Sequence, residues 1–198
     1  MNNKKQIVII QGGSVFPKYS DYLFFLKNLK VSFERLHQIT WKDTLQEKLG
    51  ENFYVINLKM PHNMNARYEE WKIFFELYVS LFNKETTLIG QSLGGIFLVK
   101  YLSENDFPKK ISKLILVSAP FSEDDLDNSL GDFTFNKNLN NLQSDKVVIV
   151  HSLDDPIIPF NHAEKYNEEI KESKLIKFKD RQHFSKDNFP EIVKIILE

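Results

Sequence analysis

Short aliphatic runs alternate along the chain with longer segments in which apolar residues recur every three or four positions. The short runs are rich in valine, isoleucine and leucine, as are strands that are buried on both faces of a parallel sheet. They lie at residues 6–10, 53–58, 86–89, 113–117, 147–150 and 175–178. The longer segments have the periodicity of helices that bury one face against a sheet. This alternation predicts one α/β layer structure with six parallel strands.

Several helices can be placed between these strands. Residues 41–49, which Gly50 follows, predict a helix before the second strand. Asn161, with Glu164 three residues later, predicts the N-cap of another helix. Between residues 71 and 82, large apolar side chains form one face of a long helix, which we interpret as core and not as a cofactor site; they are Trp71, Phe74, Phe75, Tyr78, Leu81 and Phe82.

The segment from Tyr19 to Ile39 is more aromatic than a connection between elements requires. It predicts a helix or a pair of helices directly after the first strand, at the edge where open α/β sheets bind ligands. Two interpretations stay open. The segment could form a cap over that site, or it could supply extra core or an oligomer contact. No linker or repeat divides the sequence, so we predict a single domain over residues 1–198 with an insert at about residues 19–40.

Charge and cysteine content exclude several classes of function. Lysine and arginine number 26 and aspartate and glutamate 27, so no basic excess favours nucleic-acid binding. The chain has no cysteine, which excludes a thiol nucleophile, a disulfide scaffold and a thiolate metal site. The acidic residues within 118–146 lack the spacing of a metal site and predict a solvated loop.

Neither a cofactor motif nor a membrane segment is found in the sequence. The dinucleotide pattern Gly-x-Gly-x-x-Gly does not occur. No apolar run reaches membrane-spanning length, and residues 1–5 lead into a short strand instead of a signal-peptide core. We therefore expect a cytoplasmic protein without a cofactor, a metal, a nucleic-acid partner or a membrane partner.

The third aliphatic run enters the sequence Gly90-Gln91-Ser92-Leu93-Gly94, and an apolar segment that predicts a helix follows. A strand that turns sharply into a helix holds its central residue in a strained conformation, and the flanking glycines make room for it. This context is typical of a nucleophile elbow, with Ser92 as the candidate nucleophile. One alternative is an ordinary glycine-rich turn. Another is a phosphate-binding P-loop, but its Lys-Ser/Thr ending is missing.

An acyl-transfer serine needs a histidine base and a carboxylate that orients the base. His183 lies in a polar loop after the sixth strand, and Asp154 and Asp155 follow the fifth strand, where prolines stiffen the loop. Either aspartate could orient the histidine, and the other would brace the loop. The carboxyl ends of parallel strands share one edge, so we expect these side chains to meet Ser92 there. The remaining histidines are interpreted as structural or solvent-facing; they are His37, His62, His151 and His162.

Two glycines follow the first strand in the sequence Gln11-Gly12-Gly13-Ser14. A loop without side chains lets backbone N–H groups approach a ligand. We expect the N–H of Gly13 or Ser14, together with that of Leu93, to form an oxyanion hole. The alternative is an ordinary tight turn.

These motifs together resemble the small single-domain α/β-hydrolases of the YdeN and retinoblastoma-binding-protein-nine group. The resemblance runs nearly end to end, through the sequence around Ser92, residues 57–61 and 66–71, residues 154–159, and His183-Phe184. It implies the minimal α/β-hydrolase fold, a three-layer α/β/α sandwich around a six-stranded parallel sheet with strand order 2-1-3-4-5-6. It also implies that Asp155, directly before proline, is the carboxylate and that His183 is the base.

The resemblance implies a serine hydrolase that acts on small carboxylic esters without a cofactor or metal. Amide and peptide substrates stay open, as do a protein partner and a homo-oligomer. The alternative function is a binding module of low turnover on a hydrolase scaffold. The sequence departs from the family pattern at Gln11, where histidine or proline is common, at Gln91, where histidine is common, and at Gln182, where glycine usually precedes the catalytic histidine.

Overall fold

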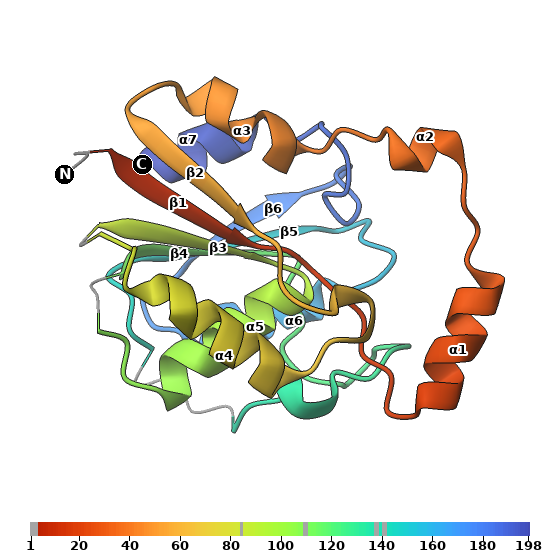
Figure 1. Ribbon diagram of the computed structural model, residues 1–198. Helices are drawn as coiled ribbons and strands as arrows, with labels where there is room; N and C mark the ends of the chain where they lie inside the picture. Colours follow the sequence, from red (N-terminus) through yellow and green to blue (C-terminus); the bar gives the residue numbers. More distant parts are fainter. Residues whose placement is uncertain (1–3, 84, 109–110, 137–138, 140–141) are drawn as a thin grey trace.

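A six-stranded parallel sheet forms the centre of the computed structural model (Figure 1). The structure describes residues 4–198 except 84, 109–110, 137–138 and 140–141. The strands lie side by side in the order β2-β1-β3-β4-β5-β6, so the predicted fold and strand order are confirmed. The strands are β1 (Lys5–Ile10), β2 (Phe53–Leu58), β3 (Thr86–Gln91), β4 (Ile111–Val117), β5 (Val147–Ser152) and β6 (Lys174–Phe178).

Helices cover both faces of the sheet (Figure 1). One face carries α3 (Trp41–Leu49) and α7 (Glu191–Leu197). The other carries α4 (Tyr68–Val79), α5 (Leu93–Glu104) and α6 (Asn161–Glu169). Successive side chains of a strand point to opposite faces, so Ile7 and Ile9 pack toward α3 and α7 while Val8 and Ile10 pack toward the other helices. Burial on both faces explains why the strand sequences are continuously aliphatic.

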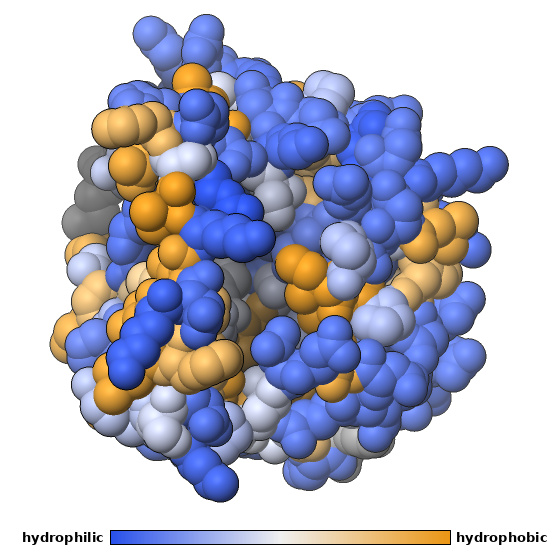
Figure 2. All heavy atoms as spheres, turned by 90° about the vertical axis from the view of Figure 1, so that its right-hand side faces the viewer, coloured by the Kyte–Doolittle hydropathy of each residue, from blue (hydrophilic) through white to orange (hydrophobic). Residues whose placement is uncertain are grey.

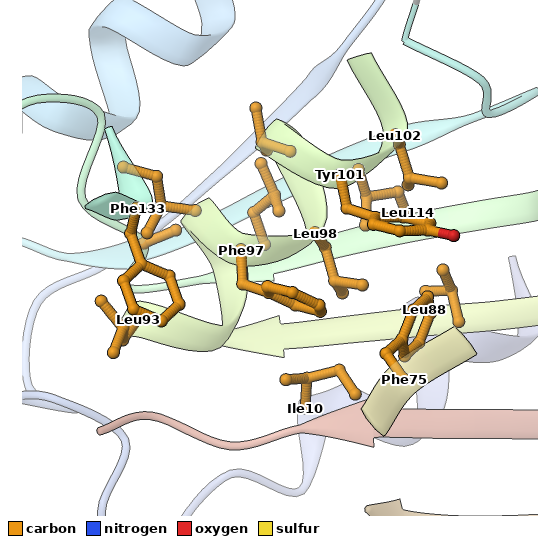
Figure 3. Packing of buried hydrophobic residues seen from close by; sticks show 14 of the residues in the cluster. Ile10, Phe75, Leu88, Leu93, Phe97, Leu98, Tyr101, Leu102, Leu114 and Phe133 are labelled. Atoms are coloured by element: carbon orange, nitrogen blue, oxygen red, sulfur yellow. The ribbon is translucent and has the colours of Figure 1, made fainter. Parts of the chain in front are cut away.

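Aromatic rings fill the larger core, between β3, α4 and α5 (Figure 3). Phe97 on α5 lies with its ring centroid 5.6 Å from the rings of Trp71 and Phe75 on α4. The interpretation of this face as core is therefore correct for these α4 residues. It is also correct for Phe82, which is buried beyond the end of α4. It is wrong for Leu81, which is 65% exposed because it follows the exposed Ile73 and Leu77 at four-residue spacing and so lies on the outer face.

The first turn of α6 also differs from the prediction. The helix begins at Asn161 itself, and Phe160 occupies the N-cap position without a side-chain cap. The Asn161 side chain instead donates a hydrogen bond to Asp125, at 2.9 Å. A tertiary contact has thus replaced the local cap that the spacing to Glu164 indicated. Two short 3₁₀ helices, Asn63–Asn65 and Gly131–Phe133, lie in the segments that follow β2 and β4.

Phe133 and Phe33 provide a matched test of where the core lies. Phe133 is fully buried, with its ring 5.1 Å from that of Trp71, whereas Phe33 is 78% exposed. We expect Phe133→Ala to lower the free energy of unfolding by about 3–5 kcal/mol. Phe33→Ala should change it by less than about 0.5 kcal/mol. Urea denaturation of both variants measures the difference, and equal losses would contradict the described core.

The insert forms an arm outside the three layers, at the right in Figure 1, made of α1 (Tyr19–Asn28) and α2 (Phe33–Leu36). Neither helix has a buried residue, so the arm adds nothing to the core of this chain. Figure 2 looks onto this side of the molecule and shows hydrophobic atoms along its left flank. The exposed large apolar residues of residues 19–39 are Tyr19, Leu23, Phe24, Leu26, Leu29, Val31, Phe33, Leu36 and Ile39. Across the described residues, every helix is too short or too polar to cross a membrane.

Candidate active site

Ser92 occupies the sharp turn between β3 and α5. Its φ of 53° and ψ of −126° place it in a region that non-glycine residues rarely adopt. The Ser92 N–H donates to the Val117 carbonyl at 2.9 Å, and the Gly95 N–H donates to the Ser92 carbonyl at 2.8 Å. These two hydrogen bonds hold the turn in place. A Cβ on Gly90 would lie 2.5 Å from the Gly95 Cα, and one on Gly94 would overlap the Ile10 carbonyl. The turn therefore requires the glycines that the sequence places there.

The loop after β1 passes directly beside this serine. A Cβ on Gly12 would lie 2.9 Å from the Ser92 Cβ, so only glycine allows this approach. Of the two candidate oxyanion donors in this loop, the Ser14 N–H already donates to the Asn63 carbonyl, at 2.8 Å. Gly13 and Leu93 both line the cavity at Ser92. The backbone N–H of Gly13 is thus the better candidate in this loop.

His183 and Asp155 meet at the carboxyl edge of the sheet, from the loops after β6 and β5. The His183 Nδ1 lies 2.9 Å from one Asp155 carboxylate oxygen and 3.1 Å from the other. The Asp155 side chain is fully buried. Burial by itself would raise the pKa of Asp155. The hydrogen bond and positive charge of His183, together with smaller contributions from Ser118 and the Ile157 N–H, outweigh burial, and the resulting pKa lies below the usual value. Asp155 is therefore ionised at neutral pH and can orient the imidazole.

Asp154 has a different set of partners. One of its carboxylate oxygens accepts hydrogen bonds from the Ser152 hydroxyl, at 2.5 Å, and from the Gln182 N–H, at 2.9 Å. The Ser152 hydroxyl in turn accepts from the Arg181 N–H at 3.1 Å. These bonds join the loop after β5 to the loop that carries His183. Asp154 therefore braces the loop, and Asp155 is the aspartate that contacts the histidine.

Gln182, directly before His183, has a backbone conformation that usually requires glycine. Gln182 has a φ of 49°, a conformation that glycine adopts without a steric penalty. The Gln182 N–H is held by Asp154, and the His183 carbonyl accepts a hydrogen bond from Gln91 Nε2 at 2.9 Å. Surrounding contacts thus hold the loop in the conformation that a glycine would favour.

The other histidines lie away from the Ser92 hydroxyl or serve the fold. His37 and His62 are exposed, and His62 pairs with Glu70 at 3.0 Å. His162 is buried and its Nδ1 accepts from the Phe121 N–H at 3.0 Å; burial lowers its pKa to about 4. The Nε2 of the buried His151 lies 2.8 Å from the Ile158 carbonyl oxygen, to which it is hydrogen-bonded, and 3.6 Å from the Asp155 Oδ2. Burial lowers the pKa of His151, so it stays neutral beside Asp155.

Ser92 and His183 line one cavity of about 390 Å³. Figure 2 faces the carboxyl edge of the sheet, where the surface is hollowed near its centre. The volume lies within the range of sites for small ligands. No residue of the insert lines the cavity, so the structure gives no support to the interpretation of the insert as a cap. Apolar residues from several loops and from the start of α5 line part of the cavity: Val15, Leu93, Leu126, Leu130, Ile157 and Ile158.

Lys42 also lines the cavity, although no sequence motif indicates a functional role for it. It lies in the first turn of α3, and its Nζ donates to Gln91 Oε1 at 2.5 Å. Gln91 Nε2 continues this chain of hydrogen bonds to the carbonyls of His183 and Phe184. No local sequence pattern predicts a contact between residues that are 49 positions apart. Within the described part of the chain, no group of three or more histidine or carboxylate side chains could hold a metal ion.

Comparisons with known proteins place the chain among hydrolases. The sequence model of a family described as serine hydrolase matches residues 33–192. The serine hydrolase RBBP9 of Rattus norvegicus is 28% identical over 148 residues, which are 73% of this chain and 76% of that protein. YdeN of Bacillus subtilis is 26% identical over 137 residues, or 66% and 70% of the two chains. The crystal structure of the B. subtilis ydeN gene product has a TM-score of 0.70 and 21% identity, covering 98% of this chain and 97% of that one.

Proposed function

Since the chain belongs to the serine hydrolase family, we propose that it hydrolyses small carboxylic esters through an acyl-enzyme on Ser92. The observation that carries the proposal is the strained Ser92 in a cavity shared with His183, whose Nδ1 is held by a buried carboxylate. A histidine held through Nδ1 presents its Nε2 as a base. The resemblance to a family of hydrolases and the cavity volume support a small substrate.

In the proposed reaction, His183 Nε2 takes the hydroxyl proton of Ser92 as the serine oxygen attacks the ester carbonyl. The negative charge that develops on the carbonyl oxygen is held by the N–H groups of Gly13 and Leu93. Asp155 stabilises the imidazolium, which then gives its proton to the departing alcohol. Water repeats the cycle on the acyl-enzyme, with His183 again as base, and releases the carboxylic acid and free Ser92.

Turnover of short esters tests this proposal. We expect the purified protein to release 4-nitrophenol from 4-nitrophenyl acetate and butyrate above the uncatalysed rate, with saturation at increasing ester concentration. The matched control is the same preparation treated with a fluorophosphonate, which should block a serine of this kind. Release that does not saturate and is unaffected by the inhibitor would contradict the proposal.

A second candidate function is a protein-binding role with little turnover. The observation that favours it is the arm of α1 and α2, where large apolar side chains are exposed. Exposed apolar surface of this kind is typical of contact sites between proteins. The ester assay separates the two functions, because a binding module would leave the ester at the uncatalysed rate.

A further inference from the structure

A single charged side chain faces the cavity at Ser92. Of the residues that line it in the described part of the chain, Lys42 alone is a lysine, arginine, aspartate or glutamate. Lys42 lines the same cavity as Ser92 and His183, and its acceptor Gln91 directly precedes Ser92 and donates to the His183 carbonyl. The cavity therefore combines apolar walls with one positive charge.

Among the described residues, no carboxylate forms a salt bridge with Lys42. The neighbouring Asp43 uses its carboxylate to accept from the Thr40 N–H at 2.8 Å and from the Thr40 hydroxyl at 2.7 Å. Burial lowers the pKa of Lys42 to about 8; Asp43 opposes the shift and Lys59 adds to it. Lys42 is thus still mostly protonated at pH 7, in surroundings that penalise its charge.

The hydrogen-bonding capacity of Lys42 is also incompletely used. An ammonium group has three donors, and Gln91 Oε1 is its one acceptor among the described residues. Nζ also lies over the ring of Trp41, 5.3 Å from the ring centroid, a contact that accepts no hydrogen bond in the ordinary sense. A ligand anion in the cavity would supply both the missing acceptors and the missing negative charge.

We propose that Lys42 forms an anion subsite of this cavity, which selects substrates that carry a carboxylate in addition to the ester. The inference rests on the proposed function, because the subsite lies beside Ser92. The carboxylate can belong to the acyl part or to the alcohol part of the ester. In either case a carboxylate would contact the Lys42 ammonium, and matched pairs of esters distinguish the two cases.

Matched pairs of esters test the subsite. The acyl pair is the mono-4-nitrophenyl ester of adipic acid and 4-nitrophenyl hexanoate, which have equal chain lengths. The alcohol pair is 4-acetoxybenzoate and phenyl acetate. The measured quantity is the ratio of kcat/KM for the anionic and the neutral ester, after subtraction of uncatalysed hydrolysis. We expect this ratio to favour the anionic ester in at least one pair, and that pair identifies the part of the substrate at Lys42.

Variants of Lys42 show whether the preference comes from this residue. Lys42→Met should lower the ratio by roughly tenfold or more, the effect of losing a charge-assisted hydrogen bond. Lys42→Arg keeps the charge and should retain most of the preference. The control is Lys171→Met, which removes an exposed positive charge outside the cavity lining that does not contribute to the pKa shift of Lys42, and it should leave the ratio unchanged. The ratio cancels any loss that acts equally on both esters, including one transmitted through Gln91.

The pH dependence gives an independent readout with a definite sign. Because burial lowers the pKa of Lys42 to about 8, its charge is present below that pH and disappears above it. The preference should therefore decline between pH 7 and pH 9 in the unmodified protein. Asp43 and Lys59 act on Lys42 electrostatically, and His183 faces the same cavity. All three are retained in Lys42→Met, which should show no such decline.

Two results would overturn the inference and leave the proposed function standing. One is hydrolysis of the neutral esters with no preference for either anionic ester. The other is a preference that Lys42→Met retains in full. If no ester is turned over and a fluorophosphonate does not label Ser92, the proposed function fails and the anion subsite fails with it.

Discussion

Ester hydrolysis is expected to fall in the Ser92→Ala variant by a factor on the order of 10⁴ to 10⁶ in kcat. The hydroxyl oxygen is the atom to which the acyl group bonds, and alanine offers no substitute. Alanine also fits the space of Ser92, because the strain at this position lies in the backbone and not in the side chain. The fold should therefore persist, and circular dichroism together with the urea midpoint checks that it does.

The control for this variant is Ser103→Ala in α5, the helix that follows Ser92. The Ser103 hydroxyl bonds to the Lys100 carbonyl at 3.1 Å and does not line the cavity. Its loss should leave kcat/KM within about twofold of the unmodified protein, as is usual for a substitution away from the site. An equal rate in Ser92→Ala and the unmodified protein would exclude Ser92 as the nucleophile.

The second large effect is expected at Asp155. Asparagine has the shape of aspartate but no negative charge, so it neither fixes the Nδ1 proton of His183 nor stabilises the imidazolium. In a comparable triad this change lowers kcat by about 10⁴-fold, and we expect a loss of that order for Asp155→Asn. The measurement is kcat with 4-nitrophenyl butyrate.

Asp154→Asn is the matched control, because it changes the adjacent residue in the same way. Its side-chain oxygen can still accept from the Ser152 hydroxyl and the Gln182 N–H, so the brace between the loops is largely kept. We expect its kcat to fall by less than about tenfold. Equal losses in the two variants would contradict the assignment of distinct roles to these aspartates.

Most of the fold could be predicted because its pattern is local. A strand buried on both faces needs apolar side chains at consecutive positions, and the packing of Ile7, Val8, Ile9 and Ile10 on alternate faces shows why. The errors lie where an apolar residue or a polar side chain serves another purpose than its local pattern indicates. Leu81 is apolar but lies on the exposed face of its segment, four residues after the exposed Leu77. Asn161 donates its side-chain hydrogen bond to Asp125 instead of capping α6.

The candidate site divides in the same way. Ser92, Asp155 and His183 each follow a strand, and the parallel topology brings their loops to one edge, where His183 and Asp155 are in contact and Ser92 shares the cavity with His183. Their catalytic roles stay predictions. Lys42 could not be found, because its place in the cavity depends on how α3 packs beside the loop of Gln91. The sequence also left Gly13 and Ser14 as alternative oxyanion donors. Every residue except proline has a backbone N–H, so the residue type does not show which N–H is free to bind a ligand.

Covalent labelling by a fluorophosphonate is the most direct test of the central claim, an activated serine at position 92. Intact-mass spectrometry of the purified protein should show a single adduct, and peptide mapping should place it on Ser92. Ser92→Ala should remain unlabelled, and His183→Ala should be labelled far more slowly, because its serine has lost the base. An unlabelled wild-type protein, or an adduct that persists in Ser92→Ala, would contradict the account.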